Sequence, residues 1–407
     1  MQKKKKKVSK ARRAARQARR MYLDYASATP LDPRVLKAMS PYWSLISGNP
    51  GALHYEGVLA KRALSDARSG IARLLHAHAP EIIFTGSGTE ANNLAIGGTL
   101  LAQERRGAPL SGMHIVTSAI EHESVLAPIR ELERRGVKVT VVMPEASGIV
   151  SAEKIIREIL PETTLVSLQS ANHEIGTIQP VPEVGKKIRE WRNLRGTTLP
   201  YFHSDASQAA LLLDVSVDRL SVDLMTLDAQ KMYGPKGVGA LYCREGVALV
   251  PVLFGGHQEQ GLRPGTENIP AIVGMAAALD FAVHGREREY KRLLKLQKLF
   301  FRSLEKKVPE ALINGDRRMR LPSNVNLSLP GRDGEMLALA LDVWGVAVTT
   351  KSACAGSEEK VSLVVRAIGK SEEEARATLR FSFGKGTRVS DIRRVTDALA
   401  HVAAQNI

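Results

Sequence analysis

The sequence predicts an α/β protein with a large, mostly parallel sheet of seven strands flanked by helices, followed by a smaller α+β region. Three observations support this fold class. Short apolar runs typical of strands alternate with longer segments that have the period of a helix. The 407 residues are 44% hydrophobic, enough for a large core, but only 5% aromatic. After Pro264 the alternation stops and consecutive helical segments begin.

The elements follow in order from the amino terminus. Residues 21–33 read as a short extended segment that Pro30 and Pro33 end. Apolar runs predict the strands of the sheet at 81–85, 114–118, 138–143, 165–169, 201–204, 224–227 and 239–243. Amphipathic patterns predict the helices between them at 34–44, 59–76, 90–105, 124–135, 152–159 and 184–194.

The second region has its own pattern. Two consecutive helices are expected at 271–284 and 286–307. The remaining elements are strands at 324–329 and 378–383 and helices at 335–342, 361–367 and 390–403. The chain is therefore expected to comprise a basic tail (1–20), a large domain (21–262) and a small carboxy-terminal domain (263–407).

The net charge of +16 is concentrated in the tail. Residues 1–20 hold eleven basic residues and no acidic one, which leaves 47 basic against 42 acidic residues elsewhere. Such a self-repelling segment cannot bury apolar surface, so a disordered tail is expected. Two other interpretations stay open. The tail could bind nucleic acid through its phosphates, or it could be a mitochondrial transit peptide, although it is poor in serine.

Composition argues against membrane-spanning and disulfide-rich proteins. No stretch approaches the ~20 consecutive apolar residues of a membrane-spanning helix, and no apolar core of a secretory signal is present. The two cysteines, Cys243 and Cys354, are too few for a disulfide framework. We therefore expect a reducing, cytoplasmic setting and no membrane partner.

Polar residues follow the predicted strands at several points. Lys231 comes after the strand 224–227, where desolvation would favour the neutral amine that imine chemistry needs. Asp205 follows the strand 201–204, where it could keep a pyridine nitrogen protonated or simply cap the next helix.

Two further segments complete this set. Gly88 and Thr89 open a helix after a strand, so their backbone N–H groups suit one phosphate. The glycine spacing there excludes a dinucleotide fingerprint and a P-loop. His122 follows the strand 114–118 and could stack on an aromatic cofactor, or be an ordinary surface histidine. Each residue alone has a structural explanation, but the ordered set favours a cofactor site.

The two cysteines have different surroundings. Cys354 lies among small and polar residues, which favours an exposed loop, and Lys351 nearby would favour the nucleophilic thiolate. Cys243 ends an apolar run and fits a buried structural role better. Cys354 is therefore the predicted reactive thiol.

These motifs resemble the cysteine desulfurases of the nitrogen-fixation and iron–sulfur-assembly type, which are fold-type I pyridoxal-phosphate (PLP) enzymes of the class V aminotransferase group. The similarity runs from residue 21 to about residue 403. The segments that carry it are 21–33, 48–50, 84–93, 117–126, 172–180, 203–208, 231–239, 261–268, 352–354 and 379–384.

The resemblance implies a role for each site residue. Lys231 would bind PLP covalently, His122 would stack on the ring, Asp205 would pair with the ring nitrogen, and Gln208 would reach the ring hydroxyl. Arg380, whose planar fork suits a carboxylate, would hold the substrate. The implied residues are Lys231, Cys354 and His122 for catalysis; Gly88, Thr89, His122, His173, Asp205, Gln208, Asp228, Gln230, Lys231 and a neighbouring subunit's Thr266 for the cofactor; and Arg380, Asn49 and His173 for the substrate.

The function implied is a cysteine desulfurase, which converts L-cysteine to L-alanine and transfers the sulfur to Cys354 as a persulfide. A sulfur-acceptor protein would take it on to iron–sulfur clusters, thio-cofactors or thiolated tRNA. A homodimer is expected because Thr266 would serve another subunit's phosphate. No metal is expected, beyond a nascent iron–sulfur cluster held transiently by Cys354. The alternatives are a selenocysteine lyase or another class V aminotransferase, and an inactive PLP-fold scaffold.

Three positions depart from the family pattern. His173 stands where a second asparagine is usual, and Gln230 replaces a histidine. Asp228 stands where a phosphate-binding serine is usual. Because a carboxylate repels a phosphate, Asp228 is expected to turn away, to be protonated or to pair with a cation.

Overall fold

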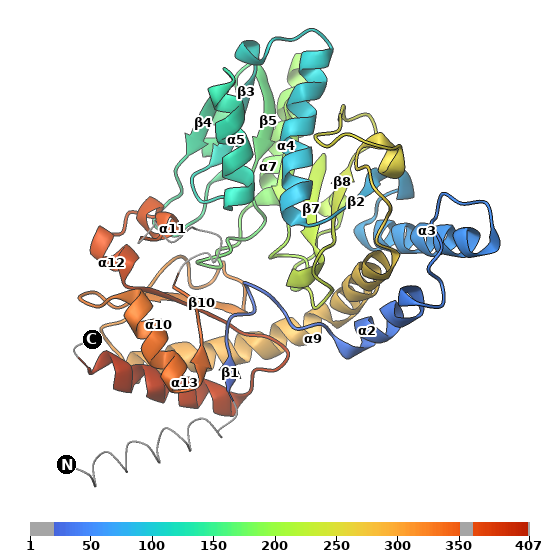
Figure 1. Ribbon diagram of the computed structural model, residues 1–407. Helices are drawn as coiled ribbons and strands as arrows, with labels where there is room; N and C mark the ends of the chain where they lie inside the picture. The colour runs from blue at the N-terminus through green and yellow to red at the C-terminus, as the bar shows by residue number, and fades with distance from the viewer. Residues whose placement is uncertain (1–19, 351–360, 406–407) are drawn as a thin grey trace.

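The structure, a computed structural model, describes residues 20–350 and 361–405. Its large sheet has the strand order β2-β8-β7-β6-β5-β3-β4, and helices cover it on both sides (Figure 1). Strand β8 is antiparallel to β2 and β7, and the other neighbouring pairs are parallel. This confirms the predicted mostly parallel sheet of seven strands. The strands are β2 (Ile82–Thr85), β3 (His114–Ser118), β4 (Lys138–Val142), β5 (Thr163–Ser167), β6 (Tyr201–Asp205), β7 (Leu224–Asp228) and β8 (Gly239–Cys243).

The two faces of this sheet pack against different helices, because successive side chains of a strand point to opposite faces. Ile115 belongs to a core cluster shared with α4 and α5, whereas its neighbour Val116 belongs to the larger cluster on the other face. Both faces are therefore covered, as parallel sheets require. The helices of this region are α2 (Pro33–Met39), α3 (Tyr55–Leu75), α4 (Gly88–Arg105), α5 (Glu123–Arg134), α6 (Ala152–Arg157), α7 (Val181–Arg195) and α8 (Val217–Leu220).

The carboxy-terminal region is α+β, as predicted. Strand β10 (Asn324–Ser328) lies between β9 (Leu312–Ile313) and β12 (Thr378–Ser382) in an antiparallel sheet. Strand β1 (Met21–Tyr22) pairs in parallel with β11 (Val346–Ala347), so the first described residues lie against this region. Its helices are α10 (Gly334–Val343), α11 (Leu363–Ala367), α12 (Glu372–Arg376) and α13 (Val389–Ala403). Single 3-10 turns in the chain are η1 (Ser40–Trp43), η2 (Ala79–Glu81), η3 (Leu110–Gly112), η4 (Ala229–Lys231) and η5 (Gln258–Gly261).

The prediction of two helices over residues 271–307 is wrong. One helix, α9 (Ile269–Lys307), runs without a break through Gly285. A glycine inside a helix costs only about 1 kcal/mol, and α9 packs against α2 and α3 as well as α13, which outweighs that cost. Figure 1 shows α9 passing from the large sheet to the carboxy-terminal region. The division of the chain at residue 263 stays a prediction.

Two sequence predictions lie outside the described residues. These are the disordered basic tail, apart from Arg20, and the loop around Cys354. Within the described ranges, every helix is too short or too polar to cross a lipid bilayer.

Candidate active site

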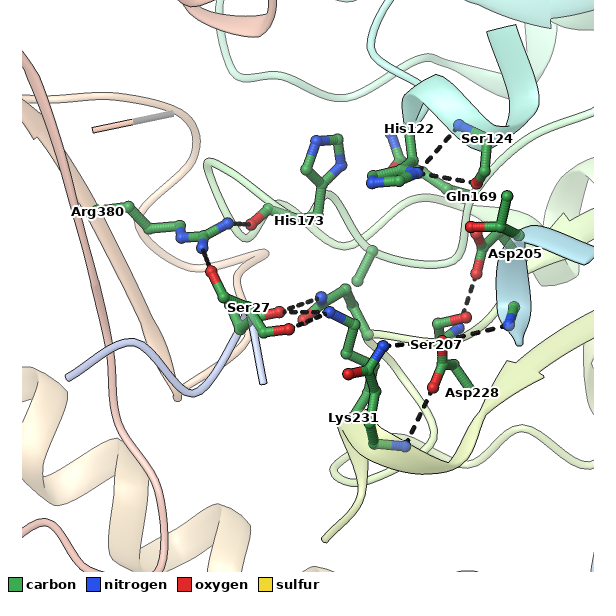
Figure 2. Close-up of a pocket in the computed structure, with 16 residues that line it drawn as sticks. Ser27, His122, Ser124, Gln169, His173, Asp205, Ser207, Asp228, Lys231 and Arg380 are labelled. Carbon is green, nitrogen blue, oxygen red and sulfur yellow. Dashed lines mark hydrogen bonds between the residues drawn. The ribbon is translucent and has the colours of Figure 1, made fainter. Parts of the chain in front are cut away.

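A pocket lies at the carboxyl ends of the parallel strands, where open α/β sheets place their ligands. Asp205 is the last residue of β6 and Asp228 the last of β7. Arg380 reaches the same pocket from β12 of the carboxy-terminal region (Figure 2). The predicted site residues that line the pocket are Gly88, Thr89, His122, His173, Asp205, Gln208, Asp228, Gln230, Lys231 and Arg380.

Two predicted site residues that the structure describes, Asn49 and Thr266, do not line this pocket. Asn49 is exposed, and its Oδ1 accepts a hydrogen bond from Gly51 N–H at 2.9 Å. Thr266 is exposed in the segment between η5 and α9. Cys354 lies outside the described residues.

The Lys231 amine is held by the amino-terminal segment. Its Nζ donates hydrogen bonds to the carbonyl oxygens of Ala26 at 3.0 Å and Ser27 at 2.6 Å. Gln208 Nε2 donates to the same Ala26 carbonyl at 2.9 Å. Lys231 and Gln208 are thus held by the same backbone carbonyl at the pocket wall, and Figure 2 shows Lys231 beside Ser27. Sequence reasoning did not single out Ala26 and Ser27 as site residues, because backbone carbonyls leave no signal in the residue type.

The Asp205 carboxylate is oriented by two neutral donors. Its Oδ2 accepts from Asn92 Nδ2 at 2.8 Å, and its Oδ1 accepts from Ser207 N–H at 2.9 Å. Asn92 is fully buried in α4 and was not predicted as a site residue. Asn92 could have been identified from the sequence, because an asparagine on an otherwise apolar face of a helix is unusual.

His122 has a defined tautomer when neutral. It is the N-cap of α5, and its Nδ1 accepts from Ser124 N–H at 3.1 Å and lies 2.8 Å from Ser124 Oγ. Asn92 Nδ2 donates to the same Ser124 Oγ at 2.8 Å, which leaves the hydroxyl free to donate to His122. Since Nδ1 is the acceptor, the proton of the neutral ring resides on Nε2.

Arg380 is 2% exposed and its guanidinium is closely held. Nη1 donates to the carbonyl oxygen of His173 at 2.8 Å. Nη2 donates to Asp24 Oδ1 at 2.9 Å and to Ser27 Oγ at 2.6 Å. Nε has no hydrogen-bond partner among the described residues. A charged group with unused donor capacity at a pocket wall suits an anionic ligand.

The N-terminus of α4 offers backbone N–H groups to the pocket, but Asp228 lies against it. Asp228 Oδ2 accepts from Gly88 N–H at 3.2 Å, and Oδ1 accepts from Gln230 N–H at 3.0 Å. Asp228 therefore does not turn away from this helix. A side chain at position 88 would meet Asp228 Cβ at 3.1 Å, so glycine permits the close approach.

Burial changes the pKa of two further groups, one beside the pocket and one at the far end of the sheet. Glu121 is buried beside His122, and its two oxygens accept from Gln169 N–H at 3.1 Å. Burial raises the pKa of Glu121 to about 8. Cys243 pairs with Leu224 at the end of the sheet away from the pocket and is half-buried rather than buried as predicted. Burial raises the pKa of its thiol to about 12, which disfavours the reactive thiolate. The described residues hold no cluster of three or more His, Cys, Asp or Glu side chains that could bind a metal ion.

Comparison with known proteins places this arrangement in a family. A family model described as aminotransferase class-V matches residues 21–395. The chain is 40% identical to a cysteine desulfurase IscS from Dictyoglomus turgidum over 384 residues, which cover 94% of each protein. It is 38% identical to cysteine desulfurase IscS 1 from Archaeoglobus fulgidus, covering 94% of this chain and 96% of that one.

Solved structures agree with this result. A NifS-like protein superposes with a TM-score of 0.86 at 32% identity, covering 94% of this chain and 99% of the other. A structure described as SspA in complex with cysteine matches with a TM-score of 0.75 at 35% identity, covering 89% and 98%. The chain therefore belongs to the class V aminotransferase family and, within it, to the cysteine desulfurases, a PLP-dependent group of enzymes, as its sequence motifs predicted.

Proposed function

We propose that this chain binds PLP on Lys231, converts L-cysteine to L-alanine, and passes the sulfur to Cys354 as a persulfide. One observation carries the proposal. The Lys231 amine, the Asp205 carboxylate, the His122 ring and the Arg380 guanidinium line the same pocket, although the chain supplies them from four separate segments. The solved structure described as SspA with cysteine supports cysteine as the substrate.

The pocket residues fit PLP chemically. Lys231 supplies the amine for its aldehyde, and Asp205 supplies a carboxylate for its ring nitrogen. His122 supplies a flat ring at the pocket wall, and Gly88 and Thr89 supply helix N-terminal amides for its phosphate. When bound, PLP would supply the electron sink that makes bonds to the substrate α-carbon and β-carbon labile. Asp228, whose carboxylate lies against the N-terminus of α4, opposes the phosphate.

The carboxylate of cysteine would bind Arg380. Its guanidinium is positioned by the His173 carbonyl and by Asp24, so little side-chain entropy is lost when substrate arrives. His122 would hold a proton on Nε2, since Ser124 occupies Nδ1, and would exchange it with the substrate.

Several parts of the proposal concern residues or partners beyond the pocket. Cys354 would receive the sulfur in its loop, whose small and polar residues favour exposure. A homodimer would bring Thr266 and Asn49, both exposed here, to a neighbouring subunit. Exposed apolar side chains support such an interface: Trp43, Leu45, Leu53, Tyr55, Leu253 and Phe254. A sulfur-acceptor protein and a cytoplasmic location complete the proposal.

Covalent trapping tests the cofactor assignment. The purified protein is incubated with PLP, reduced with borohydride and digested, and the labelled peptide is identified by mass spectrometry. We expect one pyridoxyl group on Lys231. Lys231→Ala should lose the label, whereas Lys236→Ala, which changes an exposed lysine nearby, should keep it. A label on another lysine, or none at saturating PLP, would overturn the proposal.

A further inference from the structure

His173 presents an unused nitrogen in the pocket. Its side chain is buried, with 8% exposure, and the residue lines the pocket. Its Nδ1 has no hydrogen-bond partner among residues 20–350 and 361–405. Buried polar atoms are almost always paired, so an unpaired one in a binding pocket points to a missing ligand.

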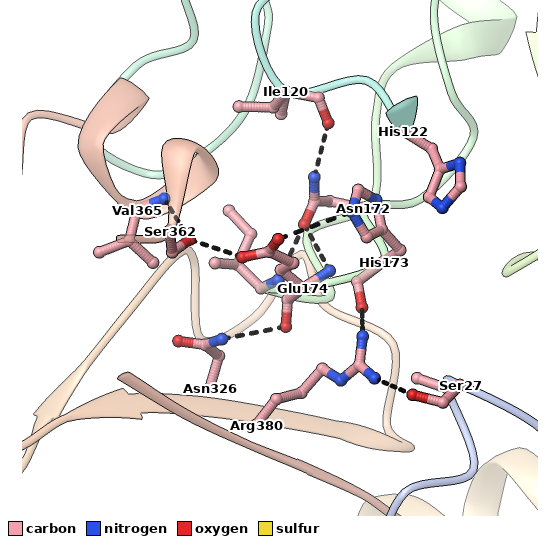
Figure 3. A network of polar contacts seen from close by, with 12 residues as sticks. Ser27, Ile120, His122, Asn172, His173, Glu174, Asn326, Ser362, Val365 and Arg380 are labelled. Carbon is pink, nitrogen blue, oxygen red and sulfur yellow. Dashed lines mark hydrogen bonds and ion pairs between the residues drawn. The ribbon is translucent and has the colours of Figure 1, made fainter. Parts of the chain in front are cut away.

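The other nitrogen of the ring faces a carboxylate. His173 Nε2 lies 3.8 Å from Glu174 Oε1, whose negative charge favours a proton on Nε2. Glu174 is itself fixed, because its Oε2 accepts from Ser362 Oγ at 2.5 Å and its carbonyl oxygen accepts from Asn326 Nδ2 at 3.2 Å (Figure 3). With Nε2 protonated, Nδ1 is a bare hydrogen-bond acceptor.

Neighbouring groups keep this acceptor neutral. Burial, followed by the positive charges that His122, Arg380 and Lys231 can carry, holds the pKa of His173 well below its ordinary value. The Glu174 carboxylate, 3.8 Å from His173 Nε2, is the negatively charged group that faces the ring. The His122 and His173 rings meet edge to face with centroids 5.0 Å apart. The two rings are complementary, since His122 offers an N–H donor at Nε2 and His173 an acceptor at Nδ1.

The substrate has three polar groups to place near this acceptor. Its carboxylate has no proton to donate and is expected to bind the Arg380 guanidinium, whose Nη1 donates a hydrogen bond to the His173 carbonyl oxygen. Its amine must reach Lys231. The thiol is the remaining donor, on the short side chain of the same amino acid.

We propose that His173 recognises the substrate thiol, with its bare Nδ1 accepting a hydrogen bond from the S–H group of L-cysteine. Because selenols are stronger acids than thiols, L-selenocysteine is largely ionised at neutral pH and has no proton to donate. The same acceptor therefore selects a protonated sulfur over an ionised selenium. This inference rests on the proposed function and names the residue that sets its substrate preference.

Two variants separate the two ring nitrogens. His173→Asn places its amide near the position of Nδ1 and retains an acceptor there, whereas His173→Gln reaches toward Nε2 and leaves the Nδ1 position empty. Binding is measured in the PLP-loaded Cys354→Ala background, so that bound cysteine keeps its sulfur. The ligands are L-cysteine and S-methyl-L-cysteine, which lacks the S–H donor, and the readout is the change in cofactor absorbance.

We expect the preference for L-cysteine over S-methyl-L-cysteine to fall about fivefold in His173→Gln and to be largely retained in His173→Asn, as loss of one modest hydrogen bond implies. In the Cys354-containing enzyme, His173→Gln should also shift the ratio of kcat/KM values toward L-selenocysteine. Cofactor content and melting temperature establish that each variant is folded.

The inference would be overturned if His173→Gln changed neither the binding preference for L-cysteine over S-methyl-L-cysteine nor the kcat/KM ratio for L-cysteine and L-selenocysteine. The proposed function would stay intact if that variant still bound PLP and formed alanine from cysteine. Equal losses in His173→Asn and His173→Gln would also overturn the inference, because a purely structural role predicts that result. Failure of the unsubstituted protein to load PLP on Lys231 or to form alanine would instead overturn the proposed function.

Discussion

Asp228→Asn is predicted to tighten the binding of PLP. The Asp228 carboxylate is 8% exposed and accepts a hydrogen bond from Gly88 N–H at 3.2 Å, at the helix N-terminus proposed for the phosphate. Its other donors, the Gln230 backbone N–H and side-chain Nε2, are neutral, so they leave its charge in place. The carboxylate and the phosphate therefore compete for one set of amides and repel each other. Asparagine keeps the shape and removes the charge.

The size of the effect follows from Coulomb's law. Two unit charges roughly 5 Å apart at an effective dielectric constant of about 20 repel by about 3 kcal/mol. Solvent screening in a partly open pocket lowers this value. We therefore expect a gain of about 1–3 kcal/mol, or roughly 5- to 150-fold in affinity.

The assay titrates the apoprotein with PLP and, separately, with pyridoxal, and follows cofactor absorbance. Pyridoxal has no phosphate, so its dissociation constant should be nearly the same in both proteins. The reasoning is refuted if Asp228→Asn weakens PLP binding, or if it changes the affinities for PLP and pyridoxal by the same factor.

Three further predictions concern stability and substrate binding. The pKa of Glu121 rises from 4.5 to about 8 in the folded protein. The protonated side chain therefore makes its full contribution to stability below pH 4.5. This contribution is lost as the pH rises to 8, by about 1.4 kcal/mol per pH unit. Glu121→Gln should reduce the pH dependence of the unfolding free energy, measured by urea denaturation between pH 5 and pH 8. Parallel curves of unfolding free energy against pH for the two proteins would contradict this. Glu259, buried in an ion pair with Arg68, also accepts from Phe84 N–H at 2.7 Å. Glu259→Ala should therefore cost about 3–5 kcal/mol in urea unfolding, and a loss below about 1 kcal/mol would count against it. Arg380→Lys should raise KM for cysteine at least about tenfold with PLP affinity unchanged, because lysine lacks the planar fork, and an unaltered KM would argue against Arg380 as the carboxylate site.

The sequence was sufficient to predict the residues at the strand ends. Asp205 and Lys231 follow buried apolar runs, and the carboxyl ends of parallel strands meet at one edge of a sheet. Their convergence therefore follows from the alternating pattern of strands and helices. The same reasoning located His122 and the helix N-terminus at Gly88.

Contacts made by the backbone, or by residues with no local pattern, were not predictable. Nothing in the types of Ala26 and Ser27 indicates that their carbonyls hold Lys231 from more than 200 positions away. Asn92 orients Asp205 across a gap of 113 positions in the chain. The unbroken helix through Gly285 depends on packing at both of its ends, which local propensity does not reveal.

Sulfur on Cys354 is the most direct test of the proposed reaction. The PLP-loaded protein is incubated with L-cysteine, alkylated and digested, and each cysteine peptide is examined by mass spectrometry while free alanine is measured. We predict one added sulfur on the Cys354 peptide, an equal amount of alanine in a single turnover, and neither product in Lys231→Ala. Alanine formed without sulfur on Cys354, or sulfur found on Cys243 instead, would contradict the account.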